Sequence, residues 1–324
     1  MDIYVKKAII HQFSPDDTDL YLADKFLNIT PKIEEYLRKK IERVYSDEAR
    51  TGIFEEDNPF LELISDDLLE TSVAVANRWK EEFVVSENQK TNDLVFIKFS
   101  KEGVDHFAFL RIALRETLTH LGGEVDNPIK LTQNNLPGFG TGADEALVIN
   151  LQSRKYHLIE KRIKYNGTFL NYFSENLLQA QPKISPKKSI KALEKTAQKI
   201  AESFNTDDFQ FQSKVKSAIF NHIEEENKLS PEKLADDLFD DNLTARLSFI
   251  DQVKEAVPEP VTFEEIDASR QLKKFENQKL SLSNGIELIV PNNVYEDAES
   301  VEFILNENGT YSILIKNIED IQSK

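Results

Sequence analysis

The chain has 324 residues, of which 40% are apolar and 30% charged, and its formal net charge is −17 at pH 7. This length is enough for two domains with hydrophobic cores, while the acidic balance excludes proteins that coat DNA through overall positive charge. The absence of cysteine excludes disulfide frameworks, thiolate metal sites and cysteine nucleophiles, and is typical of a reducing compartment.

The N-terminal segment MDIYVKKAIIHQF does not resemble a signal peptide. Asp2, Lys6 and Lys7 interrupt it, and its apolar residues alternate as they do in a strand. No other apolar run approaches the length of a membrane span. We therefore expect a cytoplasmic protein with no membrane partner.

The first elements are predicted to be two strands and a helix. Strands are expected at residues 3–13 and 19–27, paired as a hairpin through the turn SPDDTD. Thr30 as the cap and Pro31 at the first helical position predict a helix that ends near Tyr45.

The next segments predict the centre of a sheet. Apolar residues at helical spacing indicate a second helix from Asp66 to Phe83, and the runs DLVFIKF and DHFAFLRIAL, joined near Gly103, are typical of central strands. Residues 121–145 contain five of the ten glycines and are expected to form a long exposed loop without a regular element. ALVINL and YHLIEKRI then return to strand character.

The C-terminal part begins with a helical pattern and ends with a β pattern. Helices are predicted at residues 186–204, 207–227, 231–239 and 242–256. The later runs KLSLSNGIELIV and VEFILNENGTYSILIK each contain Asn-Gly, which is a strong hairpin signal. We expect the two hairpins to form one small antiparallel sheet.

These elements predict an α+β protein with two domains. The first, residues 1–182, has a mixed or mainly antiparallel sheet with flanking helices. The second, residues 183–324, is helical over residues 186–268 and is closed by the two hairpins within residues 272–317.

Lysines are concentrated on one predicted helix, within KISPKKSIKALEKTAQKIAESF. On a helical wheel the apolar residues gather on one side and the lysines on the opposite side. Between residues 154 and 199 there are eleven Lys and Arg residues against three Glu residues, a local net charge of +8. Such a face could hold a phosphate backbone while the rest of the molecule repels it. The candidate nucleic-acid-binding residues are Arg154, Lys155, Lys161, Arg162, Lys164, Lys187, Lys188, Lys191, Lys195 and Lys199.

Both the lysines and the aromatic residues of this basic window also have simpler interpretations. Lysines on an exposed helix face are equally well explained as solvated side chains. Five aromatic residues in the basic window could stack on bases, although core positions are the more frequent use of such residues; they are Tyr156, Tyr165, Phe169, Tyr172 and Phe173.

No residue pattern predicts catalysis. GFGTG at residues 138–142 lacks the Lys-Ser or Lys-Thr of a phosphate loop and precedes a strand, so it is interpreted as flexible chain. The histidines have no metal-ligand spacing, and the paired carboxylates are explained by capping. We expect no enzymatic activity, no catalytic residue, no metal and no cofactor.

Several stretches together resemble one known family. They are AIIHQF, IERVYSDEARTGIFEEDNPF, DLVFIKFSKEGVDHFAFLRI, ALVINLQSRKYHLIEKR and the terminal KLSLSNGIELIVPNNVYEDAESVEFILNENGTYSILIKN. In this order, and over nearly the whole chain, they are similar to the bacterial 37-kDa nucleoid-associated protein family. The resemblance implies a cytoplasmic, nucleoid-localised, DNA-associated protein without an established enzymatic activity, and it assigns no binding residue.

Two hypotheses follow. In the first, the basic face binds double-stranded DNA through phosphate contacts that do not depend on base sequence. In the second, the protein is an acidic adaptor that reaches the nucleoid through a DNA-processing protein partner. A homodimer is compatible with either hypothesis. An enzyme is a distant third, supported only by the glycine-rich loop.

Overall fold

The structure is a computed structural model, and it describes residues 2–16, 18–83, 90–120, 129–165, 167–206, 208–263 and 265–322. The chain divides into two compact units, Met1–Ser185 (unit 1) and Pro186–Lys324 (unit 2). The sequence predicts a domain boundary between residues 182 and 183. Each unit is described by itself below.

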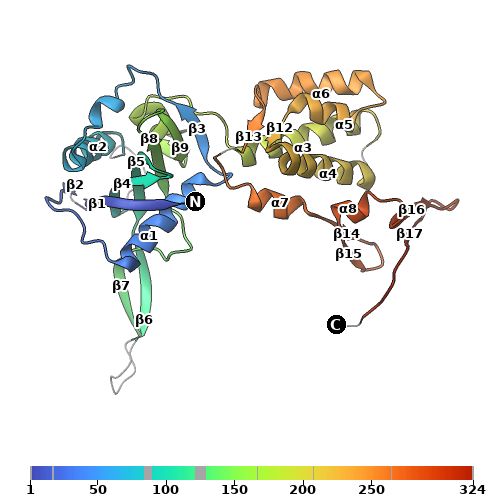
Figure 1. Cartoon of the computed structure of the whole chain (residues 1–324), viewed down its shortest axis with the longest axis horizontal. Helices are drawn as coiled ribbons and strands as arrows, with labels where there is room; N and C mark the ends of the chain where they lie inside the picture. Colours follow the sequence, from blue (N-terminus) through green and yellow to red (C-terminus); the bar gives the residue numbers. More distant parts are fainter. Residues whose placement is uncertain are drawn as a thin grey trace. The chain divides into compact units, whose positions relative to one another are not determined.

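Unit 1 is built on an antiparallel sheet of seven strands (Figure 1). Every pair of neighbouring strands in it is antiparallel, which is the second of the two arrangements that the sequence allowed. In spatial order the strands are β2 (Asp19–Tyr21), β1 (Ile3–Ser14), β4 (Asn92–Lys101), β5 (Val104–Ala113), β8 (Glu145–Asn150), β9 (Lys155–Ile159) and β3 (Arg50–Ile53). Together with the helices, this sheet confirms the α+β class.

Both faces of the sheet are covered. Alternate side chains of β4 enter two separate cores: Phe96 belongs to one, and Ile97 belongs to the other. The core on the Ile97 side contains α1 (Pro31–Glu42) and the 3-10 turn η1 (Arg43–Tyr45). The core on the Phe96 side contains the 3-10 turn η2 (Leu61–Leu63), α2 (Leu68–Phe83) and the π-helix η3 (Phe173–Leu177).

Local signals that the sequence carries account for several of these boundaries. The Thr30 hydroxyl accepts a hydrogen bond from the backbone N–H of Ile33 at 3.4 Å, with proline in the first turn, so the predicted start of α1 is confirmed. The turn between β4 and β5 consists of Glu102 and Gly103, both with positive φ, at 53° and 83°. A two-residue turn of this kind matches the twist of the strands that it joins.

Three expectations for unit 1 are corrected. The strand expected at residues 19–27 ends at Tyr21. The segment YHLIEKRI is divided between β9 and β10 (Ile163–Tyr165), which pairs with β11 (Thr168–Leu170) in a separate ribbon. The expected loop contains a strand, β7 (Ile129–Asn135), which pairs with β6 (Arg115–His120) in a ribbon that extends from the sheet (Figure 1). Residues 121–128 of that loop lie outside the described residues.

Unit 2 begins with four helices around one hydrophobic core. Apolar side chains from every helix enter this core, including Leu193, Ile219, Leu234 and Phe249. The helices are α3 (Pro186–Ser203), α4 (Phe209–Glu226), α5 (Pro231–Leu238) and α6 (Leu243–Ala256). Unit 2 also contains a two-stranded ribbon, in which β12 (Lys228–Leu229), between α4 and α5 in the chain, pairs with β13 (Val261–Thr262), after α6. A short helix, α7 (Ser269–Phe275), follows β13.

The predicted C-terminal hairpins are present, but they do not form one sheet. The first joins β14 (Asn277–Ser281) to β15 (Glu287–Pro291), and the second joins β16 (Val301–Leu305) to β17 (Tyr311–Ile315), each as a separate two-stranded sheet. The helical turn α8 (Asn292–Tyr295) lies between the two hairpins in the chain. Their Asn-Gly glycines have φ values of 86° and 78°. Within the described residues, no helix has the length and apolar character needed to cross a bilayer.

Candidate nucleic-acid interface

Helix α3 presents a continuous row of lysines on the surface of unit 2. Its inner side packs against α4 and α6 through buried residues that include Ile190, Leu193 and Ala197. The opposite side consists of exposed lysines at intervals of three or four residues, which places them in line along the helix. We call these four residues, Lys188, Lys191, Lys195 and Lys199, the lysine row.

Carboxylates do not mask most of the lysine row. The ammonium groups of Lys188, Lys191 and Lys195 form no hydrogen bond or ion pair with any described residue. Lys199 donates to the neutral amide oxygen of Gln252 at 3.0 Å. The row therefore keeps its positive charge available to a ligand.

Glu194 and Glu202 are the carboxylates on α3, and each has a partner. Glu194 forms an ion pair with Lys274 of α7 at 3.2 Å, and Glu202 accepts a hydrogen bond from Gln198 at 3.3 Å. Lys274 lies far from α3 in the sequence, so the periodicity of α3 alone gives no signal for it. By neutralising Glu194, it preserves the positive potential of the neighbouring row.

The N-terminal end of α3 adds to this potential. Its first turn contains no acidic residue and does contain Lys187 and Lys188. The helix dipole already places partial positive charge at this end, so lysines here are unfavourable for the helix and favourable for an anion.

The other predicted binding residues belong to unit 1, and several of them are paired. Arg154, which has a positive φ of 59°, pairs with Glu56 at 3.2 Å, and Lys161 pairs with Asp144 at 2.8 Å. Arg162 donates to the carbonyl of Phe169 at 3.0 Å. Lys155 on β9, Lys164 on β10 and Lys187 on α3 also have interaction partners. The ten predicted residues are thus divided between two units, and only the four residues of the lysine row share one face of one element.

Most of the aromatic residues in the basic window are in the core. Tyr156, Tyr172 and Phe173 are buried, so their rings are not available to stack on bases, and the core interpretation is confirmed for them. Phe169 is 56% exposed. The side chain of Tyr165 lies outside the described part of the structure.

The glycine-rich segment GFGTG is held in place by a buried lysine. The ammonium group of Lys40 donates to the carbonyl oxygens of Gly138, at 2.9 Å, and Thr141, at 2.5 Å, so the interpretation as flexible chain is corrected. Burial, together with Arg43 and Arg115, lowers the pKa of Lys40 from 10.5 to about 8. Carbonyl oxygens directed at a cation have the opposite polarity to the N–H groups that cradle a phosphate.

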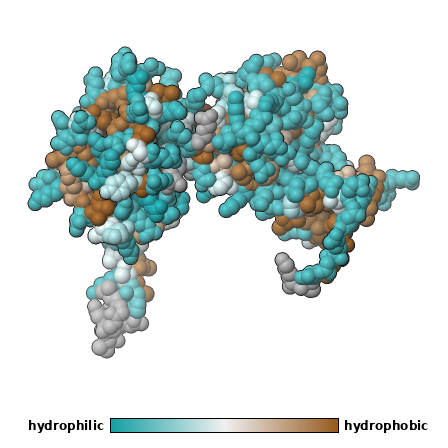
Figure 2. Space-filling view, in the orientation of Figure 1, coloured by the Kyte–Doolittle hydropathy of each residue, from teal (hydrophilic) through white to brown (hydrophobic). Residues whose placement is uncertain are grey.

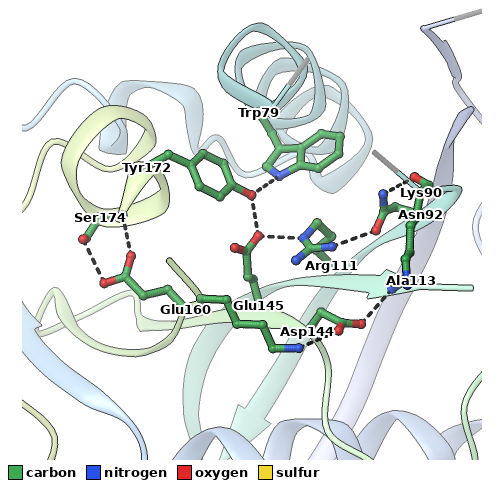
Figure 3. Close-up of polar contacts among 11 residues, drawn as sticks. Trp79, Lys90, Asn92, Arg111, Ala113, Asp144, Glu145, Glu160, Tyr172 and Ser174 are labelled. Atoms are coloured by element: carbon green, nitrogen blue, oxygen red, sulfur yellow. Dashed lines mark hydrogen bonds and ion pairs between the residues drawn. The ribbon is translucent and has the colours of Figure 1, made fainter. Parts of the chain in front are cut away.

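A buried polar cluster joins the sheet of unit 1 to α2 and to the residue that precedes η3 (Figure 3). Arg111 of β5 donates to Glu145 of β8 at 2.6 Å and to Asn92 at 2.9 Å. The hydroxyl of Tyr172 donates to the same carboxylate and accepts a hydrogen bond from Trp79 at 3.0 Å. Burial and the Glu145 charge raise the pKa of Tyr172 well above its usual value. The cluster is enclosed in the interior, and we assign it a structural role.

No group of three or more His, Cys, Asp or Glu residues that could hold a metal ion is present in the described parts of the chain. The scattered histidines are used elsewhere. His11 contacts the Ser72 hydroxyl at 2.9 Å in the interior, and His222 contacts Asp237 at 2.7 Å.

Comparison with known proteins complements this geometry. No protein in a curated collection matches the chain. The family model described as nucleoid-associated protein YejK matches residues 9–321, which is nearly the whole chain. The chain therefore belongs to the family of 37-kDa nucleoid-associated proteins.

Proposed function

We propose that this nucleoid-associated protein binds double-stranded DNA through the lysine row of α3, by phosphate contacts that do not depend on base sequence, within the nucleoid of the cytoplasm. The observation that carries the proposal is the alignment of exposed lysines, three of which have no partner among the described residues. The proposed role is binding and not catalysis.

The dimensions of the row suit a phosphate backbone. At a rise of 1.5 Å per residue, Lys188 and Lys199 are separated by about 16 Å along the helix axis. One strand of B-DNA carries about five phosphates over that length of its helix axis, and they wind around the axis. Four flexible lysines can therefore contact several phosphates at once without a fixed register, as expected for binding that ignores sequence.

The rest of the molecule would restrict where DNA binds. The chain carries 57 Asp and Glu residues against 40 Lys and Arg residues, so most of its surface repels a polyanion. Binding is then confined to the local positive face.

The test is the affinity for duplex DNA at one fixed, moderate salt concentration. We expect the triple variant Lys188→Gln/Lys191→Gln/Lys195→Gln to bind more weakly than wild type, because it loses three phosphate contacts. A matched control, Lys228→Gln/Lys254→Gln/Lys279→Gln, removes the same charge from exposed positions elsewhere in unit 2 and should bind as wild type does.

Equal weakening of the two triple variants would mean that only net charge matters, and the lysine row would lose its assigned role. If wild type itself does not bind duplex DNA near physiological salt, the adaptor hypothesis becomes the better one. In that case the acidic surface, and not α3, would connect the protein to the nucleoid.

A further inference from the structure

Strand β17, with the sequence YSILI, is strongly apolar and yet lies at the surface of unit 2. Tyr311, Leu314 and Ile315 are 52%, 47% and 48% exposed. On the neighbouring strand Leu305 is 63% exposed, and after β17 the tail adds Ile318 at 52%. Hydrophobic side chains reach the surface in the region of the C-terminal hairpins in Figure 2.

The outer edge of β17 is open. The backbone N–H of Asn306 donates to the carbonyl of Thr310, and the backbone N–H of Lys316 donates to the carbonyl of Ser300. These two bonds determine which residue pairs of the ribbon are hydrogen-bonded and which are not. In an antiparallel ladder the intervening residues of β17, Tyr311, Ile313 and Ile315, direct their N–H and C=O groups away from β16. No other strand in the described residues pairs with this edge.

Aromatic side chains on one face of the ribbon fix it to the helices. Phe303 of β16 packs against Phe209 of α4 and against Tyr295 of α8, with ring centroids 5.2 Å apart in both pairs. Tyr311 of β17 also packs against Phe209, at 5.2 Å. These contacts hold β17 in an extended conformation, so a partner would not have to order it on binding.

The chain that forms and flanks the ribbon is acidic. Of the eight charged residues between positions 292 and 322, only Lys316 is basic, and it forms an ion pair with Glu302. The acidic residues are Glu296, Asp297, Glu299, Glu302, Glu307, Glu319 and Asp320. This charge repels DNA. It also disfavours a second copy of the chain, because a twofold interface would bring the same acidic set together from both sides.

An exposed apolar edge strand is a template for pairing with another chain, and proteins normally protect such edges. We infer that the edge of β17 binds an extended, lysine- or arginine-rich segment of a partner protein, which adds a strand to the β16–β17 ribbon. Main-chain hydrogen bonds to Tyr311, Ile313 and Ile315 provide affinity, and the acidic surroundings select a basic segment. This inference concerns a different surface from the lysine row and does not depend on the proposed contact with DNA.

The experiment measures binding of a fluorescent peptide of about ten residues, a common strand length, in which lysine alternates with valine. The full chain should bind this peptide and should not bind the counterpart with glutamate in place of lysine. In Ile315→Pro the outward N–H is lost while the ladder to β16 keeps its hydrogen bonds, and we expect the affinity to fall by about tenfold or more.

The matched control is Ile289→Pro in β15, which replaces an exposed isoleucine at the corresponding outward position of the other hairpin and should bind as wild type does. A second variant, Glu319→Lys/Asp320→Lys, changes two exposed residues beyond the last strand and should weaken binding without affecting the fold. The inference is overturned if wild type does not bind the lysine peptide, if it binds the glutamate peptide equally well, or if both the Ile315→Pro variant and the charge variant retain wild-type affinity.

Discussion

Arg111 and Glu145 form an ion pair in the interior of unit 1, where both side chains are shielded from water. Asn92 accepts a hydrogen bond from the Arg111 guanidinium, and the Tyr172 hydroxyl donates to Oε2 of Glu145, but Oε1 of Glu145 has no hydrogen-bond partner in the described residues. A buried pair of this kind is costly to break, because removal of one partner leaves the other charge buried and uncompensated.

At the level of single residues, we expect Arg111→Met to reduce the free energy of unfolding by about 3–5 kcal/mol, since Glu145 then stays buried without its cation. The double variant Arg111→Met/Glu145→Leu should be more stable than Arg111→Met alone, because it removes both charges together. Urea unfolding of the wild type, both single variants and the double variant measures this coupling. Purely additive effects would show that the pair is not energetically coupled.

One member of this ion pair can be recognised in the sequence, and the other cannot. Arg111 is recognisable as the single charged residue within the apolar stretch FAFLRIAL, residues 107–114. Its partner is not recognisable, because Glu145 follows the glycine-rich segment and reaches Arg111 only through the pairing of β5 with β8. Tyr172 comes from a further segment. Contacts of this range depend on the order of strands in the sheet, which local patterns do not encode.

Helices and strands can be predicted where a cap, a turn or a periodic pattern within a few residues marks them, and they are missed where no such pattern is present. The cap at Thr30, the Asn-Gly hairpins and the amphipathic pattern of α3 each lie within a few residues of sequence. Strand β7 escapes prediction because the surrounding glycine, proline and asparagine residues obscure the alternation of Ile129 and Leu131. The separation of the two C-terminal hairpins also depends on packing, namely of Phe303 on Phe209.

Helix α3 itself provides a test of whether its lysines serve the fold. Lys188 lies two residues after Pro186, the first residue of α3, where a glutamate would favour the dipole and complete a capping box with Ser185. We expect Lys188→Glu to stabilise unit 2 by about 0.3–1 kcal/mol while it weakens DNA binding. Thermal unfolding and a DNA titration of the same sample measure the two effects.

The control for this prediction is Lys195→Glu, in the middle of the same lysine row. It makes the same change of charge far from the helix ends, so it should weaken DNA binding, and its effect on stability should come only from attraction to Lys191 and Lys199 and not from the dipole. If Lys188→Glu destabilises unit 2, the lysine contributes to the fold, and the interpretation of the row as a binding feature is weakened.

At the scale of the whole molecule, the positions of the charged residues in the fold, and not the net charge, determine where a basic surface forms. The sequence predicts one basic face over residues 154–199, but the structure divides these residues between unit 1 and unit 2. Counting charges along the chain could not reveal that Glu56 and Asp144, which lie outside the counted window, pair with Arg154 and Lys161. The structure confirms only the alignment of exposed lysines on the single helix α3, and their role in binding stays a prediction.

The two surfaces of unit 2 have opposite character. The lysine row is suited to phosphate, while the β17 edge, with its acidic surroundings, is suited to a basic polypeptide. A molecule with both could connect DNA to a protein that acts on it, which would reconcile a net charge of −17 with a place at the nucleoid.

The most direct measurement is the salt dependence of the affinity for duplex DNA, for the wild type and for Lys188→Gln/Lys191→Gln/Lys195→Gln. If these lysines contact phosphates, the slope of log affinity against log salt should be shallower in the variant by about three, one for each lost contact. Parallel lines for the two proteins would contradict the assignment of the lysine row as the DNA-binding surface.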